Sequence, residues 1–303
     1  MKSITIKPVL EVLEIVNTGY YARNEKRIEL PYTTEQMLHA DVYSTKETSS
    51  FVEAFPQMTK GNLNGMTIHM RNQDSLSAAW DLHQKRMPGE KPVLVLNFAN
   101  PRRPGGGIRE TPYTQEENLC HNTTLLASIQ TRDAWAFYQE NLDCGTMAQT
   151  DALIISPNAM VLRNGDGSLR TDPFPVAIMT ISAPLAKRMK PEEKLDLEAI
   201  LLRRIRAMLR TAMADGYRKV VLGAWGCGAF GNDPEVVARL FHQVLTESFG
   251  PDNGYRASDF FNEITMAVMD TAEGSPRYHS FARYFGEKNA GISNLSCTET
   301  RLL

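Results

Sequence analysis

Two adjacent glutamates, Glu116 and Glu117, belong to the triplet QEE, which follows three consecutive glycines after a spacer of seven residues in the stretch GGGIRETPYTQEEN (residues 105–118). A carboxyl group can protonate the oxygen of a glycosidic bond and then activate the water molecule that attacks the sugar. Since neighbouring side chains on a helix diverge by about 100°, we expect different roles, one glutamate holding a ligand and the other transferring a proton. Considered by itself, a Glu-Glu pair has a simpler interpretation as the solvated first turn of a helix.

A second glycine-rich stretch, GCGAFG, occupies residues 226–231 and matches the pattern G-x-G-x-x-G. It follows the apolar segment KVVLGA (residues 219–224) and precedes a helix that we expect to begin at Asp233 and Pro234. Glycines at such a strand–helix junction allow backbone N–H groups to approach a diphosphate, and the helix dipole favours the same anion. The stretch therefore predicts a diphosphate-binding loop, with a turn required only for packing as the alternative.

A nicotinamide site is a poorer interpretation of this loop. A dinucleotide-binding unit places an acidic residue at the end of the next strand, about 20 residues after the glycines. In this sequence the next apolar segment ends near Asp270, much further along the chain. We therefore expect a diphosphate ligand and disfavour a nicotinamide-dependent oxidoreductase.

Both glycine stretches follow expected strands. The segment NFANPRRPGGG (residues 97–107) comes directly after the most apolar strand, and GCGAFG comes after another. In open α/β sheets, ligands bind beyond the carboxyl ends of the strands. The two loops are therefore expected to flank one crevice that could hold an extended ligand.

Apolar segments predict buried strands, and amphipathic segments predict the helices between them. A helix is expected over residues 75–86 with Asp74 as its N-cap, and the turn sequence NGDG predicts a hairpin over residues 160–169. Strands that alternate with helices predict an α/β fold in which helices cover both faces of a parallel or mixed sheet. Strands are expected at residues 66–70, 92–99, 152–156, 175–183, 219–224 and 263–269.

The longest expected helix covers residues 191–216. Its apolar residues recur along one stripe, and a glycine follows its last turn. Arg203, Arg204, Arg206 and Arg210 lie outside the stripe, and we expect them to form a solvated face rather than a track for binding a polymer.

The composition limits the class of partner and the compartment. The chain has 303 residues and a formal charge of −2, so we expect one large globular domain, with or without an extension, and disfavour duplex DNA as the main partner. Its four cysteines form no C-x-x-C pair, which argues against a zinc site or a disulfide framework and favours the cytoplasm. No charge-free apolar run approaches about 18 residues, so no membrane span is expected.

The combination of GGG, a seven-residue spacer and QEE resembles the catalytic signature of the poly(ADP-ribose) glycohydrolases. The resemblance extends to LNFANPRRPGGG, QEENLC, SPNAMVLRNGDGSL, MTISAPLA and VLGAWGCGAFGNDP, which look like the microbial form of the family. It implies a macrodomain-like three-layer sandwich with a mixed central sheet and a mainly helical N-terminal extension. The implied boundaries are 1–65 for the extension, 66–290 for the catalytic domain and 291–303 for a C-terminal tail.

The resemblance also implies roles for individual residues. Glu117 and Glu116 would form the catalytic pair, with Glu117 as the acid and base. Glu116 and Asn100 would bind the ribose at the scissile bond, Gln115 would support their loop, and Asp74 would contact adenine. The other implied ligand-binding residues belong to the two glycine loops and are Gly105, Gly106, Gly107, Gly226, Cys227, Gly228, Ala229, Phe230, Gly231 and Asn232.

The implied function is hydrolysis of ribose–ribose bonds with release of ADP-ribose, without a cofactor or a metal ion. The partner would be ADP-ribose or poly(ADP-ribose), on a modified protein or nucleic acid, with no membrane and no sequence-specific nucleic-acid binding. Two alternatives stay open, namely hydrolysis of another ADP-ribosylated protein or nucleobase, and a non-catalytic ADP-ribose-binding module. The charged spacer residues Arg109 and Glu110 are unusual beside a diphosphate loop and could alter access or specificity.

Overall fold

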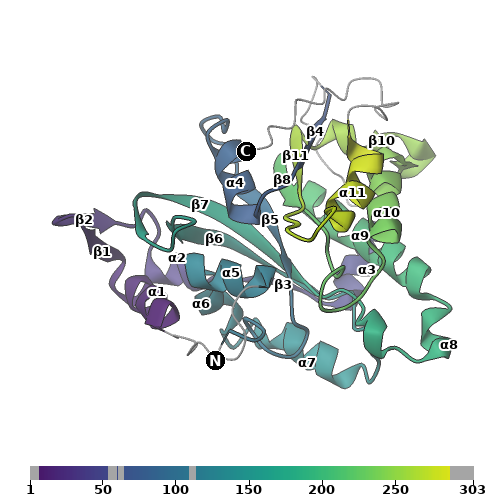
Figure 1. Ribbon diagram of the computed structural model, residues 1–303, viewed down its shortest axis with the longest axis horizontal. Coiled ribbons are helices and arrows are strands. Elements are labelled where there is room, and N and C mark those ends of the chain that lie inside the picture. The colour runs from purple at the N-terminus through teal and green to yellow at the C-terminus, as the bar shows by residue number, and fades with distance from the viewer. Residues whose placement is uncertain (1–6, 54–59, 61–64, 109–113, 287–303) are drawn as a thin grey trace.

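The computed structural model describes residues 7–53, 60, 65–108 and 114–286. Its centre is a mixed seven-stranded sheet in the order β3-β6-β7-β5-β8-β11-β4 (Figure 1). All neighbours from β7 to β4 are parallel, whereas β6 runs antiparallel to both β7 and β3. The strands are β3 (Asp41–Tyr43), β4 (Thr67–Arg71), β5 (Val93–Phe98), β6 (Leu153–Arg163), β7 (Leu169–Ile181), β8 (Lys219–Leu222) and β11 (Glu263–Ala267).

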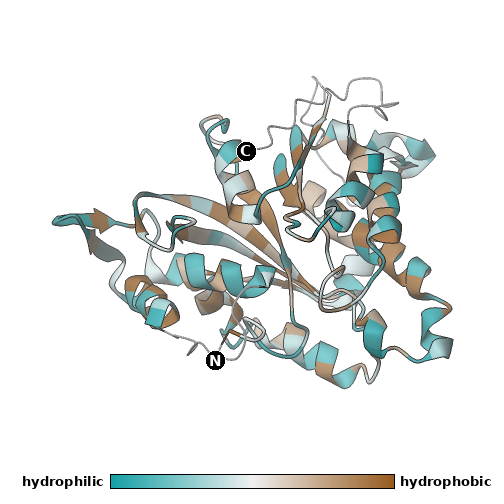
Figure 2. Cartoon of the chain, in the orientation of Figure 1, coloured by the Kyte–Doolittle hydropathy of each residue, from teal (hydrophilic) through white to brown (hydrophobic). Residues whose placement is uncertain are grey.

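Helices cover both faces of this sheet. They are α4 (Ser75–His83), α5 (Gln115–Asn122), α6 (Leu125–Ile129) and α7 (Trp135–Asp143) on one face, and α9 (Leu197–Ala214), α10 (Pro234–Thr246) and α11 (Pro276–Phe285) on the other. Val93 and Val95 of β5 pack against the first group, and Leu94 and Leu96 pack against the second. This alternation follows from the two-residue period of a strand, and the apolar colouring in Figure 2 runs along the strands and the inner helix surfaces. The predicted three-layer α/β fold with a mixed sheet is confirmed.

Local sequence signals agree with this architecture. Asp74 caps α4 by accepting hydrogen bonds from Leu76 N and Ser77 N, and Asp233 caps α10 by accepting one from Glu235 N. The predicted NGDG hairpin joins β6 to β7, and both strands are longer than expected. The starts of α4 and α10 are therefore each set by one capping aspartate.

The N-terminal segment is built from helices and short strands and packs onto the sheet. Val12, Ile15 and Met37 form a small apolar core with side chains of β6. β3 pairs with residues 153–155 of β6 and is one of the two edge strands of the main sheet. The other elements of the segment are α1 (Lys7–Thr18), α2 (Thr34–Leu38), α3 (Thr45–Glu53) and the hairpin of β1 (Tyr20–Arg23) and β2 (Lys26–Glu29).

The three implied boundaries stay predictions. The edge position of β3 shows that the segment before residue 65 contributes to the same sheet as the rest of the chain. Residues 287–303, which include the implied tail, lie outside the described part of the chain.

The single helix predicted over residues 191–216 is wrong. The structure has a short helix α8 (Pro191–Lys194) and then α9, with a break at Leu195 and Asp196. Leu195 is 84% exposed, so the apolar stripe that faces the core begins only in α9. Neither α9 nor any other helix within the described ranges is long and apolar enough to cross a membrane.

The prediction of a solvated arginine face on this helix is wrong for Arg204 and Arg210, whereas Arg203 is exposed as expected. The side chain of Arg204 is fully buried and donates hydrogen bonds to Asp151 and to backbone carbonyl oxygens. Arg210 is buried as well, and it pairs with Glu247. Because α3 and the segment before β6 cover this side of α9, these arginines contact carboxylates and carbonyls in place of water.

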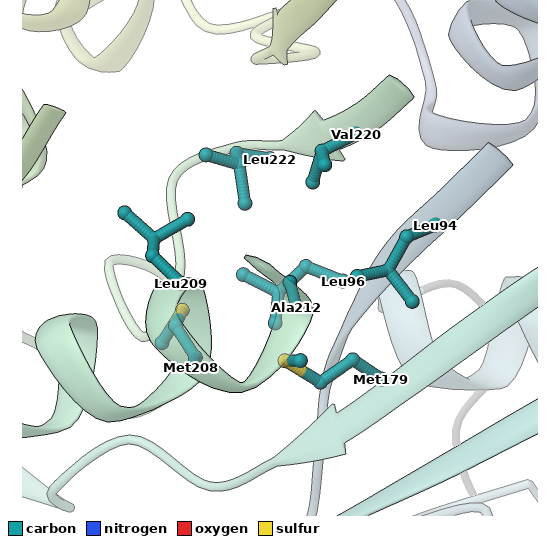
Figure 3. A pocket seen from close by; sticks show the side chains of 8 residues that line it. All are labelled: Leu94, Leu96, Met179, Met208, Leu209, Ala212, Val220 and Leu222. Atoms are coloured by element: carbon teal, nitrogen blue, oxygen red, sulfur yellow. The ribbon is translucent and has the colours of Figure 1, made fainter. Parts of the chain in front are cut away.

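A small apolar cavity lies between α9 and the sheet. Figure 3 shows its eight lining side chains, which come from β5, β7, β8 and α9. Its volume of about 10 Å³ leaves no room for an organic ligand. Without polar partners it would not stabilise a water molecule either, so the cavity belongs to the packing of the core.

We expect Arg204→Ala to lower the free energy of unfolding by about 3–5 kcal/mol, because it would leave a buried carboxylate without its buried partner. The matched control is Arg203→Ala, since Arg203 bonds to the same Asp151 carboxylate but has a side chain that is 51% exposed. Arg203→Ala should lower the free energy of unfolding by about 1 kcal/mol or less. Urea unfolding measures both variants, and equal losses would contradict this account of the buried pair.

Candidate active site

A cleft of about 420 Å³ opens where the neighbouring parallel strands β5 and β8 end. Phe98 and Gln115 line it from the side of β5 and α5, and Gly226 and Phe230 line it from the loop that follows β8. This volume is typical of small-molecule sites, and the position at the carboxyl ends of strands is the expected one. The sequence-predicted residues that line the cleft are Asp74, Gln115, Gly226, Gly228, Ala229 and Phe230.

Gln115 fixes the start of α5 to the end of β5. Its side-chain oxygen accepts a hydrogen bond from Phe98 N, and its amide donates to the carbonyl oxygen of Leu96 and to the hydroxyl of Ser75. These bonds join β5, α5 and α4 at the edge of the cleft. They therefore set the position of the two glutamates that follow.

The carboxyl group of Glu116 is buried behind the cleft, and only 2% of the residue is exposed. Its Oε2 accepts a hydrogen bond of 2.8 Å from Asn100 N, and its Oε1 has no partner among the described residues. Burial raises the pKa of Glu116 to about 8; the bond from Asn100 opposes this rise, and the nearby carboxyl of Glu117 adds to it. Glu116 is therefore largely protonated at neutral pH.

Glu117 has different contacts, although only 4% of it is exposed. Its Oε1 accepts a hydrogen bond of 2.6 Å from Gly107 N, and its Oε2 accepts one from the hydroxyl of Thr114. Thr114 precedes α5 and lines the cleft, so one hydroxyl group joins this carboxyl group to the cleft wall. The interpretation of the pair as a solvated helical turn is wrong, since both carboxyl groups are buried.

Gly106 allows both carboxyl groups to approach the same loop. Its φ is +57°, and a Cβ atom at this position would lie 2.6 Å from Oε1 of Glu117 and 2.7 Å from Oε2 of Glu116. Only glycine fits a positive φ at such distances. The glycine run thus provides contact with the glutamates, a use that the sequence did not indicate. Arg109 and Glu110, which follow it in the spacer, lie outside the described residues.

Asn232 closes the loop that follows β8. Its amide donates hydrogen bonds to the carbonyl oxygens of Pro184 and Gly226, and a Cβ atom on Gly226, whose φ is +73°, would lie 2.5 Å from that amide nitrogen. Burial raises the pKa of the Cys227 thiol to about 12, which makes it a poor nucleophile at neutral pH. A Cβ atom on Gly228 would meet nothing within 4 Å, so the backbone at this lining position is open, whereas Phe230 of the same loop lines the cleft with a large side chain.

Comparison with known proteins identifies the family to which this site belongs. The family model for the catalytic domain of microbial-type PARG, the poly(ADP-ribose) glycohydrolases, matches residues 10–164. The chain belongs to the microbial-type PARG family. It therefore has a glycohydrolase catalytic domain, as the sequence predicted, and the disfavoured oxidoreductase interpretation is excluded.

Solved structures of bacterial PARG proteins share the fold. PARG from Thermomonospora curvata is 30% identical with a TM-score of 0.81, and the match covers 92% of this chain and 98% of that one. The same PARG bound to the inhibitor ADP-HPD is 31% identical, with a TM-score of 0.77 and coverage of 91% and 97%. PARG from Deinococcus radiodurans in complex with ADP-ribose is 30% identical, with a TM-score of 0.75 and coverage of 86% and 99%. No curated protein matches the chain.

Two contacts at the cleft of this PARG-family chain were not predicted. The hydroxyl of Thr114 binds the carboxyl group of Glu117. The pattern T-x-x-E over residues 114–117 is typical of a capping box, but Thr114 makes no side-chain capping bond, so the pattern does not indicate this contact. The second contact is the pairing of Arg277 with buried Asp270. No local pattern marks it, because neither residue lies in a recognisable motif.

Asp74 lies at the cleft as well as at the start of α4. Its carboxylate accepts hydrogen bonds from Leu76 N, Ser77 N and the Ser77 hydroxyl, which accounts for its role as a cap. Its contact with adenine stays a prediction. Within the described ranges, no three His, Cys, Asp or Glu side chains are grouped so that they could hold a metal ion.

Gly106→Ala should lower the free energy of unfolding by about 2 kcal/mol, because the new Cβ atom would overlap both carboxyl groups at a positive φ. Gly165→Ala is the control, since a Cβ atom at that turn position meets nothing within 4 Å. Urea unfolding compares the two variants. Similar stability would contradict the close contact at Gly106.

The raised pKa of Glu116 predicts a pH-dependent stability. From roughly pH 4.5 to pH 8 the folded ligand-free protein keeps a proton that the unfolded chain releases, so the contribution of this group to stability decreases as the pH rises. Glu116→Gln removes this titration, and the stability of the variant relative to wild type should therefore increase across that interval. Urea unfolding at several pH values measures the difference, and a constant difference would show that Glu116 titrates normally.

Proposed function

We propose that the protein hydrolyses the ribose–ribose bonds of poly(ADP-ribose) and releases ADP-ribose, with Glu117 as general acid and base. The observation on which this proposal rests is the unequal binding of two buried carboxyl groups beside one cleft. Glu116 is bound by Asn100 N behind the cleft, whereas Glu117 is joined to the cleft wall through Thr114. Membership of the PARG family and the ADP-ribose complex of the D. radiodurans relative support the same substrate class.

In the proposed reaction Glu117 acts first as an acid. Its carboxyl group gives a proton to the glycosidic oxygen, the bond from that oxygen to the anomeric carbon breaks, and the bonding electrons leave with the departing hydroxyl. The anomeric carbon becomes oxocarbenium-like. The carboxylate of Glu117 then takes a proton from the water molecule that attacks this carbon, which restores the acid and completes the hydrolysis.

The contacts of Glu117 suit both halves of this cycle. The N–H of Gly107 can stabilise the carboxylate. The hydroxyl of Thr114 can donate a hydrogen bond to the carboxylate or accept one from the acid, because a hydroxyl is both donor and acceptor. The carboxyl group can therefore keep its orientation while its protonation changes.

Glu116 and Asn100 would hold the ribose at the scissile bond. The side-chain oxygen of Asn100 accepts hydrogen bonds from Arg102 N and Arg103 N, which leaves its amide NH₂ group to donate to a sugar hydroxyl. A protonated Glu116 can also act as a donor. Gln115 would maintain this arrangement through its bonds to β5.

The loop over residues 226–232 would bind the diphosphate through backbone N–H groups. Gly228 and Ala229 line the cleft with little or no side chain, and Phe230 would pack on a ribose or on adenine. Asp74 would contact the adenine. The glycines of residues 105–107 would let the backbone lie against the same diphosphate.

Glu117→Gln should reduce the rate of ADP-ribose release by about 100-fold or more, because an amide cannot transfer the proton. The affinity for free ADP-ribose should change little, since the amide retains the shape of the carboxyl group. Incubation with auto-modified ADP-ribosylated protein followed by product chromatography measures release, and calorimetry measures binding. The control is Glu29→Gln, whose side chain is 63% exposed on β2.

The outcomes separate the alternatives. Full activity of Glu117→Gln would contradict the proposed role of that residue. Tight binding of ADP-ribose by the wild type without release would favour a binding module. Release of ADP-ribose from singly modified protein or nucleobase, but not from polymer, would favour a hydrolase that acts on another ADP-ribosylated substrate.

A further inference from the structure

One basic side chain lines the cleft. Among the described lining residues, Arg277 of α11 is the only one with a positive charge. The loop after β8 contributes uncharged residues to the same cleft, including Gly226 and Gly228. An anionic ligand would therefore meet backbone N–H groups from that loop and one charged side chain from a different element.

A buried carboxylate holds Arg277 in place. The side chain of Asp270 is 0% exposed, and its Oδ1 accepts a hydrogen bond of 2.9 Å from Nη2 of Arg277. Its Oδ2 accepts hydrogen bonds from Arg277 N at 2.7 Å and from Tyr278 N at 3.3 Å, so the same carboxylate caps the first turn of α11. The carboxylate of Asp270 thus holds both the guanidinium group of Arg277 and the first turn of α11.

The guanidinium group of Arg277 retains donors for a ligand. An arginine side chain has five N–H donors, and within the described part of the chain Asp270 is the partner of this one. The side chain is 38% exposed, in contrast to the fully buried Arg204, which bonds to Asp151 and several carbonyl oxygens. Arg277 therefore differs from the arginines that only stabilise the fold.

Arg277 also lies near the loop proposed to bind the diphosphate. Burial is the main influence on the pKa of the Cys227 thiol and raises it, and the charge of Arg277 acts in the opposite direction. Such an effect requires proximity, because charge interactions weaken with distance. Cys227 lies between the two lining glycines Gly226 and Gly228, and Arg277 lines the same cleft as these glycines.

We propose that Arg277 binds a phosphate of a nucleoside-diphosphate ligand, with Asp270 as its positioning residue. The identity of the ligand as ADP-ribose rests on the proposed function. A guanidinium group suits this role because its N–H donors form a planar fork that matches phosphate oxygens. The cleft then recognises the diphosphate by a fixed charge in addition to backbone N–H groups.

The test measures binding of free ADP-ribose by calorimetry, at low and at high salt, to wild type, Arg277→Gln and Arg277→Lys. Arg277→Gln should weaken binding by about 10- to 100-fold, the loss expected for one hydrogen bond to a charged group. Its affinity should also depend less on salt. Arg277→Lys should lose less, because it retains the charge without the fork. Adenosine, which has no phosphate, should compete equally well in all three proteins.

Arg283→Gln is the matched control. Arg283 lies on the same helix, its side chain is 69% exposed, it pairs with Glu235, and it is not among the described residues that line the cleft. Its substitution should leave ADP-ribose binding unchanged. Thermal melting shows whether each variant folds. If Arg277→Gln does not fold, the affinity of Arg277→Lys for ADP-ribose tests the inference, since a smaller loss of affinity is still expected for it.

Unchanged ADP-ribose binding in the Arg277 variants would overturn the inference, and so would an equal loss for ADP-ribose and adenosine. If ADP-ribose binding depends on Arg277 but the wild type releases no ADP-ribose from polymer, the proposed function fails and this inference stands. If the wild type releases ADP-ribose from polymer and Arg277→Gln binds ADP-ribose like the wild type, this inference fails and the proposed function stands.

Discussion

The loop at Gly106 and the carboxyl groups of Glu116 and Glu117 constrain each other, because a Cβ atom at this glycine would lie 2.6 Å from Oε1 of Glu117 and 2.7 Å from Oε2 of Glu116. The glutamates accept hydrogen bonds from Asn100 N and Gly107 N, so they bind the loop on both sides of this glycine. The loop and the start of α5 are therefore positioned by each other. Both depend in turn on β5, to which Gln115 ties the helix.

The molecule neutralises buried acidic groups in two different ways. On the α9 side of the sheet, Asp151 and Glu247 are paired with arginines. At the cleft, Glu116 has no cation bonded to it within the described part of the chain, and burial favours its protonated form. The fold thus uses ion pairs for Asp151 and Glu247 and, at the cleft, for Asp270, whereas a bound proton neutralises Glu116.

The sequence predicted those features that are encoded locally. The run over residues 92–99 could be recognised as a buried strand from its apolar residues alone, and Asp74 and Asp233 could be recognised as caps from the helices they precede. The spacing of GGG and QEE indicated the family, and with it the mixed sheet.

Features that depend on distant partners could not be predicted in this way. Arg204 looked like a surface residue because its partner Asp151 lies far from it in sequence, before β6. The burial of Glu116 depends on the folded path of the chain from Asn100 onwards, which no helical periodicity describes. The break before α9 was missed because Leu195 has the apolar character of the stripe but points to solvent.

The two edge strands of the central sheet, β3 and β4, lie early in the chain, and the strands with which they pair lie later. β3 pairs with residues 153–155. Within the described part of the chain β4 pairs with β11 alone, and β11 pairs in turn with β8. During synthesis β4 therefore stays unpaired until β11, which lies nearly two hundred residues later in the chain, has been made. Pairing over such a separation is slow, because a long loop must be closed before any contact forms. The N-terminal half of a nascent chain would thus have the glutamates but neither the β8 wall of the cleft nor a closed sheet, and its exposed strands would be open to pairing with other chains until the last strand arrives.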